Sequence, residues 1–181
     1  MEIWNEYFLG ICNKVAENSK CMSRKIGAII VKDKSIISTG YNGPPRGVPH
    51  CNRRHLYDPK LVEKLKYYFG CSNKYEDLTK CPRQLMGYKS GEGLEWCVAG
   101  HAERNAIVNA AREGIKVKGT TMFMNCNIPC TPCLVEIINS GISEIVVIDI
   151  EYYDISAKYL LCNSKLIART FDGIYAFDRK K

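Results

Sequence analysis

The stretch that determines the fold is HAERNAIVNAAREGIKVKGTTMFMNCNIPCTPCLVEIINSGISEIVVIDI (101–150). It changes repeatedly between helix-like and strand-like patterns. Residues 101–114 and 131–141 have helical spacing, and each segment ends at a glycine. Residues 120–126 and 144–150 are apolar runs with the length of a buried strand. This alternation predicts an α/β sandwich in which part of the sheet is parallel.

The flanking segments extend the same pattern in both directions. Apolar residues recur at helical spacing over 2–18, and strand-like runs follow at 26–32 and 35–41. Downstream, 154–164 has helical spacing and 165–170 resembles a short strand. We therefore expect a three-layer αβα sandwich around a mixed five-stranded sheet.

The length and composition are those of an ordinary globular protein. A chain of 181 residues is expected to form one domain over 1–181, with a cysteine-rich insertion at about 52–100. No apolar run approaches the roughly 18 residues that cross a bilayer, and the first residues lack the pattern of a secretory signal. We therefore expect a cytoplasmic protein that does not bind membranes.

The charge balance favours a partner that carries phosphate. There are 26 basic and 19 acidic residues, for a net charge of +7. This excess does not by itself distinguish a nucleotide from a polynucleotide.

The ten cysteines indicate a metal more than a disulfide framework, because thiols stay reduced in a cytosolic chain. Cys12, Cys126 and Cys162 lie on apolar periodic segments and are expected in the core. The others require another explanation.

Two short motifs carry the chemistry. His101-Ala102-Glu103 and Pro129-Cys130-Thr131-Pro132-Cys133 each stand at the start of a predicted helix. One imidazole and two thiolates are three ligands for a catalytic zinc, whose fourth position stays open for water. Helix N-termini favour the negative charge of thiolates. Glu103 is spaced to face the metal without binding it, and it can accept a proton and return it to a substrate.

Each motif alone has an ordinary alternative. His-x-Glu at a helix start is usually a solvated cap, and Cys-x-x-Cys can be a redox pair or half of a structural zinc site. Together and in this order they match the H-x-E…P-C-x-x-C signature of zinc nucleobase deaminases. The joint match favours catalytic zinc on His101, Cys130 and Cys133.

The sequence resembles the cytidine deaminase superfamily and, within it, the deoxycytidylate (dCMP) deaminases. The similarity includes residues 19–51 with the loop Gly-Tyr-Asn-Gly-Pro-Pro (40–45), and it continues through both zinc motifs. It implies a cytidine deaminase-like fold and hydrolysis of dCMP to dUMP and ammonia, which supplies dUMP for thymidylate synthesis. Glu103 would be the catalytic residue.

The resemblance also implies how the substrate is held. Asn42 would hydrogen-bond the sugar or base of the nucleotide. The 5′-phosphate would contact Ser23, Arg24, Lys25 and Tyr153. The alternative for Arg24 and Lys25 is an ordinary solvated turn.

Members of this family often form hexamers that dCTP activates and dTTP inhibits. By resemblance, the effector would contact Tyr41, Asn42, Gly43 and Arg112. A homo-oligomer, with a hexamer as the specific expectation, follows from the same similarity.

Some dCMP deaminases also carry a second, structural zinc. The resemblance assigns its four thiol ligands to Cys21, Cys51, Cys81 and Cys97. A closed zinc site would order a long insertion that buries little apolar surface. The alternatives are four unpaired thiols, or a site that uses Cys71 or His50 instead.

Three other functions remain open. A deaminase could also accept dCTP or a 5-substituted dCMP, because all present the same reactive base. An enzyme acting on polynucleotides would use the positive charge for the backbone and show salt-sensitive binding. A non-catalytic zinc protein could only bind nucleotides, but it would have no use for the carboxylate of Glu103.

Overall fold

The computed structural model describes residues 3–69 and 78–177, and these form two compact units. The larger one, here the sheet unit, comprises residues 1–19, 26–42 and 101–181. The smaller one, here the insert unit, comprises residues 20–25 and 43–100.

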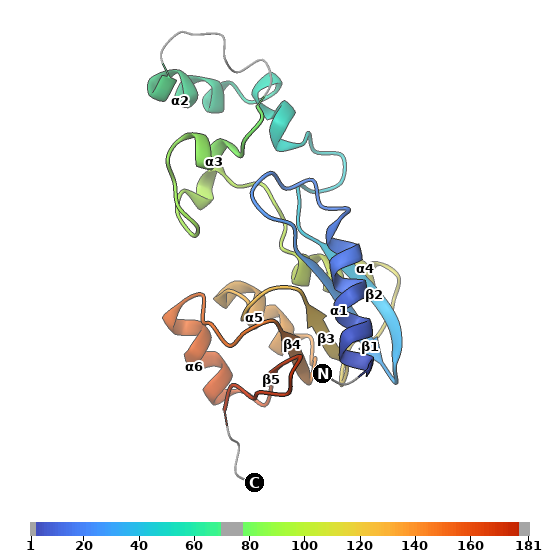
Figure 1. The fold of residues 1–181 in the computed structure, drawn as a ribbon. Helices are drawn as coiled ribbons and strands as arrows, with labels where there is room; N and C mark the ends of the chain where they lie inside the picture. The colour runs from blue at the N-terminus through green and yellow to red at the C-terminus, as the bar shows by residue number, and fades with distance from the viewer. Residues whose placement is uncertain (1–2, 70–77, 178–181) are drawn as a thin grey trace. The chain divides into compact units, whose positions relative to one another are not determined.

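The sheet unit contains one mixed five-stranded sheet, as predicted. Its strands have the spatial order β2-β1-β3-β4-β5 (Figure 1). β1 is antiparallel to both β2 and β3, whereas β3, β4 and β5 are parallel to one another. The strands are β1 (Gly27–Lys32), β2 (Ser35–Tyr41), β3 (Thr121–Met124), β4 (Glu144–Val147) and β5 (Ile167–Thr170).

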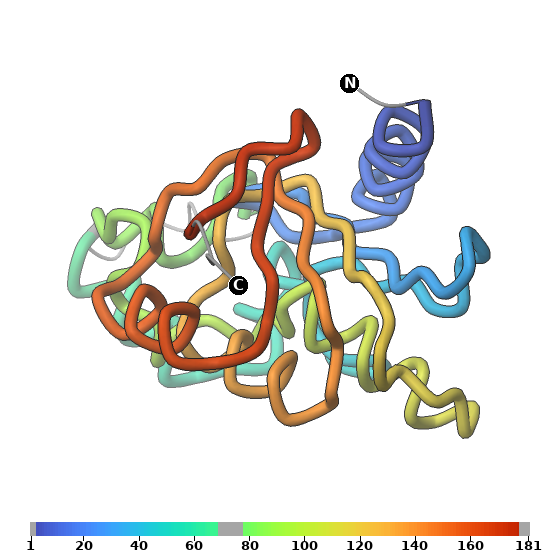
Figure 2. Tube along the Cα trace, turned by 90° about the horizontal axis from the view of Figure 1, so that it is seen from below, coloured from blue at the N-terminus to red at the C-terminus, as the bar shows by residue number. Residues whose placement is uncertain are grey.

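Helices cover both faces of this sheet, which confirms the three-layer sandwich. Ile30 and Met122 pack with three helices, whereas their neighbours Ile29 and Phe123 pack with a single helix. This alternation is the period of two expected of a strand. Figure 2 shows the N-terminal helix and the last two helices on opposite sides of the strands. The single helix is α1 (Ile3–Ala16), and the three are α4 (Ala102–Arg112), α5 (Thr131–Asn139) and α6 (Ile155–Asn163).

Two of the predicted strands end earlier than expected. The strand predicted over 120–126 leaves the ladder after Met124, because the Asn125 side chain accepts a hydrogen bond from the Gly27 amide at 2.8 Å. The strand predicted over 144–150 ends at Val147. Both strands are therefore shorter than their apolar runs, and the residues after them begin loops.

One of the three cysteines expected in the core lies elsewhere. Cys12 is buried as predicted, and Cys126 packs against the core while partly exposed. Cys162 is exposed, because α6 turns Ala157 and Leu161 toward the sheet instead. The core prediction for Cys162 was therefore wrong.

α4 packs directly on the backbone of edge strand β2. A Cβ atom on Gly40 would overlap the carbonyl of Ala102 and the amide nitrogen of Ala106. A glycine inside a strand commonly marks such a close approach. Asn105 and Asn109 of α4 donate to β2 carbonyls at 2.8 Å, and thus occupy acceptors on the free edge of the sheet. These contacts determine where α4 begins.

The insert unit has a small core. Its longest helix among the described residues covers 59–69, and three short helices precede or follow it along the chain. The buried core consists of Leu61, Leu65, Leu78 and Met86. The helices are η1 (Cys51–Leu56), α2 (Pro59–Phe69), α3 (Pro82–Leu85) and η2 (Leu94–Trp96).

Among residues 3–69 and 78–177, no helix combines the length and apolar character of a membrane-spanning segment.

A partly buried ion pair joins the parallel strands. Arg169 of β5 lies 2.8 Å from Glu144 of β4, with side-chain exposures of 15% and 21%, and Thr121 of β3 donates to the same carboxylate at 3.0 Å. Arg169→Leu leaves that carboxylate without its counter-charge, so we expect the free energy of unfolding to fall by about 2 kcal/mol in denaturant titrations. Lys14→Met breaks a pair that is 76% and 63% exposed, and it should change stability by less than about 0.5 kcal/mol. Equal losses in the two variants would contradict this account.

Candidate metal centre

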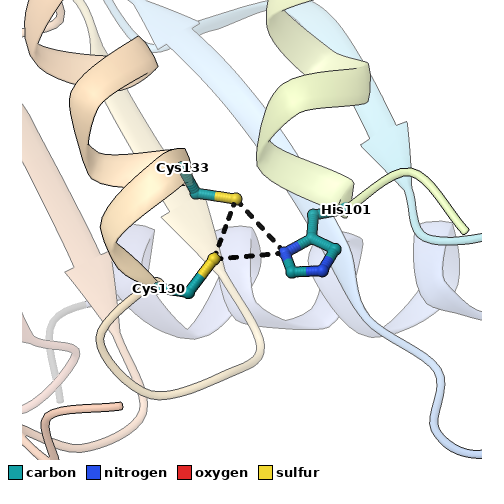
Figure 3. A group of neighbouring side chains, drawn as sticks. All are labelled: His101, Cys130 and Cys133. Carbon is teal, nitrogen blue, oxygen red and sulfur yellow. Dashed lines mark hydrogen bonds between the residues drawn. The ribbon is translucent and has the colours of Figure 1, made fainter. Parts of the chain in front are cut away.

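Three predicted metal ligands converge in the sheet unit (Figure 3). The Nδ1 atom of His101 lies 3.5 Å from the sulfur of Cys130 and 3.2 Å from that of Cys133. The two sulfurs are 3.5 Å apart. His101 thus shares one small site with two cysteines that follow it by 29 and 32 residues in the sequence.

The start of each helix positions these ligands. His101 is the N-cap residue of α4 and Cys130 that of α5, both with extended backbone, and Cys133 lies one turn into α5. Pro132 lies between the two cysteines, in the first turn of α5. Amide hydrogens of the first turn have no partner within the helix, so proline, which lacks one, loses no hydrogen bond there. The positive ends of both helix dipoles therefore point toward the thiolates.

The spacing of the three atoms fits a tetrahedral zinc. Bonds of about 2.3 Å to sulfur and about 2.0 Å to nitrogen at tetrahedral angles place the sulfurs about 3.8 Å apart and each sulfur about 3.5 Å from the nitrogen. The observed separations are 3.5, 3.5 and 3.2 Å. Three protein ligands leave one position open, as in catalytic zinc sites.

The ligands affect each other's protonation. The hydrogen bond with the Cys133 thiol, and then the contact with His101, lower the pKa of Cys130 to about 4. The same bond and burial raise the pKa of Cys133, and the bond with Cys130 raises the pKa of His101. One thiolate is thus stabilised within the site, and metal ligation requires thiolates.

Glu103 is a buried carboxylate beside these ligands. Glu103 is 4% exposed, and its side chain forms a hydrogen bond with the side chain of Cys133. Desolvation by burial raises the pKa of Glu103. A buried carboxyl group with a raised pKa beside a metal centre is a candidate general acid–base catalyst.

Two further contacts hold the helix starts, and the sequence analysis missed both. Arg104 makes a bidentate pair with Glu136, at 2.8 and 3.0 Å, which joins the first turn of α4 to α5. Asp154 accepts hydrogen bonds from the backbone and hydroxyl of Thr131, the residue after Cys130. The sequence places Asp154 at the start of the predicted helix 154–164, but it does not indicate the contact with α5.

The predicted substrate residues belong to both units. Asn42 is buried in the sheet unit, where its side-chain oxygen accepts the Ile26 amide hydrogen at 2.8 Å. Tyr153 of the same unit is 42% exposed. The other three predicted phosphate contacts are exposed residues of the insert unit: Ser23, Arg24 and Lys25. Their roles remain predictions.

The predicted effector residues are divided in the same way. Tyr41 is 44% exposed on β2, and its carbonyl accepts from Asn105. Arg112, at the end of α4, pairs with Glu113 at 2.9 Å. Gly43 belongs to the insert unit.

The four cysteines expected to bind a structural metal all lie in the insert unit. Burial first, and then the charges of Cys81, Cys21 and Cys97, raise the pKa of the Cys51 thiol to about 11. The charges of the other three thiols thus act on Cys51, but among residues 3–69 and 78–177 the ligand atoms that lie within 4.8 Å of one another are those of His101, Cys130 and Cys133. His50 is exposed, and Cys71 lies outside the described residues.

Sequence comparison connects the site to known proteins. Residues 2–149 match the family model of the cytidine and deoxycytidylate deaminase zinc-binding region. The chain is 36% identical over 148 residues to a deoxycytidylate deaminase of Mycobacterium phage D29, covering 79% of this chain and 92% of the phage protein. It is 32% identical over 144 residues to a deoxycytidylate deaminase of Schizosaccharomyces pombe, covering 79% of this chain but 36% of the yeast protein. The chain therefore spans about a third of that yeast relative.

Structural comparison finds the same fold. A dCMP deaminase of the cyanophage S-TIM5, solved in complex with dCMP and dUMP, aligns with a TM-score of 0.62 and 21% sequence identity. The alignment covers 94% of this chain and 98% of the cyanophage chain. The mixed sheet and its helices are thus the architecture of that enzyme.

Proposed function

Because this chain belongs to the cytidine and deoxycytidylate deaminase family, we propose that it hydrolyses dCMP to dUMP and ammonia with zinc held by His101, Cys130 and Cys133. The observation that carries this proposal is the convergence of three ligand atoms beside the buried carboxylate of Glu103. The dUMP produced would supply thymidylate synthesis. Deoxycytidylate deaminases among the relatives support the choice of substrate.

The residues of this chain divide the reaction between them. When bound, zinc would acidify a water molecule so that it serves as the nucleophile near neutral pH. Glu103 accepts the proton of that water, passes it to the ring nitrogen of cytosine and delivers another to the departing amine. Burial of Glu103 excludes bulk water from this proton path.

The nucleotide is held by groups outside the metal centre. Asn42 contacts the sugar or base, and its orientation is set by the hydrogen bond from the Ile26 amide. Ser23, Arg24, Lys25 and Tyr153 contact the 5′-phosphate. The positive net charge of +7 favours such an anionic substrate.

A panel of four substrates tests the proposal: dCMP, dCTP, deoxycytidine and a cytosine-containing oligonucleotide. We expect the highest kcat/KM for dCMP, with ammonia release as the readout. Comparable values for dCMP and dCTP would instead indicate a bifunctional deaminase. Turnover of the oligonucleotide alone would overturn the substrate, and zinc binding without turnover of any of the four would indicate a nucleotide-binding protein.

The insert unit supports a second, structural zinc. Its apolar core is small, consisting of Leu61, Leu65, Leu78 and Met86. Small cores of this kind often depend on a metal for stability. Four thiols of this unit, of which three act electrostatically on Cys51, would supply a closed set of ligands: Cys21, Cys51, Cys81 and Cys97.

Zinc stoichiometry distinguishes a second site from four unpaired thiols. We expect purified protein to hold two zinc ions per chain and the Cys51→Ser variant to hold one, because three thiols no longer close the tetrahedron. Cys162→Ser removes an exposed thiol on α6 and should keep both ions. One zinc in the unaltered chain, or two in Cys51→Ser, would contradict the second site.

Assembly, regulation and location extend the proposal. Tyr41 and Val108, which are 44% and 57% exposed, place apolar surface on β2 and α4 that a homo-oligomer would cover, with a hexamer as the specific form. The effectors, dCTP or dTTP, would contact four residues: Tyr41, Asn42, Gly43 and Arg112. A cytoplasmic location agrees with the nine cysteines among residues 3–69 and 78–177, none of which forms a disulfide with another.

A further inference from the structure

The first turn of α5, which carries two of the zinc ligands, lacks the usual side-chain hydrogen bond from its N-cap residue. The first amide hydrogens of a helix lack partners within the helix, and an N-cap Ser, Thr, Asp or Asn usually accepts one of them. In α5 the N-cap residue is Cys130, and it makes no such side-chain bond. Its thiolate is committed to the metal, so any acceptor must come from another part of the chain.

Asp154 supplies that acceptor from a distant position. Its Oδ2 accepts the Thr131 amide hydrogen at 3.0 Å, and its Oδ1 accepts the Thr131 hydroxyl at 2.5 Å. The same Oδ1 accepts the Ala157 amide hydrogen at 2.8 Å as the N-cap of α6. One carboxylate therefore caps two helices and ties the start of α5 to the start of α6.

This group is ionised at neutral pH. Burial alone would raise the pKa of Asp154, but the hydrogen bonds from Thr131 and Ala157 outweigh it and lower the pKa. The carboxylate can therefore accept all three hydrogen bonds at once.

We propose that Asp154 is a positioning residue for the catalytic zinc, which it serves by fixing the turn that carries the Cys130 thiolate. The proposal rests on the proposed zinc site. Thr131 directly follows Cys130, so releasing Thr131 lets the first turn of α5 fray and moves one sulfur relative to Cys133 and His101. Zinc sites tolerate deviations of only about 0.2 Å in ligand distance, and losing a partner behind the ligands typically costs about 10- to 100-fold in metal affinity.

The replacement Asp154→Asn separates the two capping roles. Asparagine is as good an N-cap as aspartate, so its single oxygen can still serve α6. Its amide nitrogen replaces Oδ2 and cannot accept the Thr131 backbone amide hydrogen, whereas the oxygen in the place of Oδ1 keeps the Thr131 hydroxyl. Thr131→Val removes the hydroxyl contact alone and leaves the α6 cap untouched, whereas Thr131→Ser keeps that hydroxyl.

The zinc dissociation constant, measured by competition with a chelator, tests the proposal. We expect it to rise about 10- to 100-fold in Asp154→Asn and by a smaller factor in Thr131→Val, and to stay within about twofold in Thr131→Ser. Arg169→Leu serves as a destabilised control away from the zinc ligands and should leave the constant unchanged. A purely structural cap would lower the melting temperature of Asp154→Asn without changing zinc affinity.

The outcomes separate this inference from the function it rests on. If the unaltered chain binds zinc tightly and both Asp154→Asn and Thr131→Val bind it equally tightly, the positioning role is wrong and the proposed function stands. If the unaltered chain binds no zinc at His101, Cys130 and Cys133, both are wrong. Weakened binding in Asp154→Asn, with full affinity in Thr131→Ser and Arg169→Leu, supports the role.

Discussion

Replacing Glu103 by glutamine is expected to lower kcat for dCMP by about 10⁴-fold, the upper range for loss of a general acid–base group. Glutamine has nearly the same shape, so it fits the buried position of a residue that is 4% exposed. It cannot take up the proton of the attacking water or return it to the base. Steady-state kinetics measures the loss of kcat, and metal analysis of the same preparation measures its zinc content.

The zinc content of Glu103→Gln should equal that of the unaltered chain, because Glu103 is not among the three converging ligands. Glu113→Gln is a matched control at the other end of α4, where the side chain is exposed and pairs with the neighbouring Arg112. It should retain full activity. Activity near the unaltered level in Glu103→Gln would show that another group transfers the proton.

Gly40→Ala is expected to lower the free energy of unfolding by at least about 3 kcal/mol, the upper end for overpacking a core. The added methyl group would overlap the backbone of Ala102 and Ala106, which cannot move aside as a flexible side chain can. α4 must shift as a unit, and it carries both His101 and Glu103. We therefore expect zinc affinity and turnover to fall together with stability in denaturant titrations.

Gly10→Ala is the control for this prediction. Gly10 lies within α1 and has no atom within 4 Å of a Cβ placed on it. Alanine there should raise stability by about 0.5–1 kcal/mol, because it favours the helix more than glycine does. A stable, zinc-binding Gly40→Ala variant would contradict the proposed close packing of α4 on β2.

The sheet and its helices could be predicted because their signals are local. Apolar periodicity and terminal glycines located the helices, and the strand-like runs at 26–32 and 35–41 leave two residues between them, Asp33 and Lys34, which form a tight turn with φ angles of 49° and 63°. The metal ligands could be predicted because two short motifs carry them at the starts of helices. Each of these features is contained within a few consecutive residues.

The missed features depend on contacts between distant segments. Asp154 reads as the cap of its own helix, and nothing in its neighbours indicates that it also binds Thr131, 23 residues earlier. The Arg104–Glu136 pair spans 32 residues in the same way. Cys162 lies on an apolar stretch, but only the packed orientation of α6 shows that it faces outward. Such features follow from tertiary packing and leave no local pattern.

The most direct test of the central claim is the conversion of dCMP by the purified chain, first stripped of metal and then restored with zinc. The account predicts no turnover without metal. With zinc restored, it predicts dUMP and ammonia in equal amounts. Turnover by the metal-free chain, or none from the zinc-restored chain with His101, Cys130 and Cys133 occupied, would contradict the proposed zinc-dependent deamination.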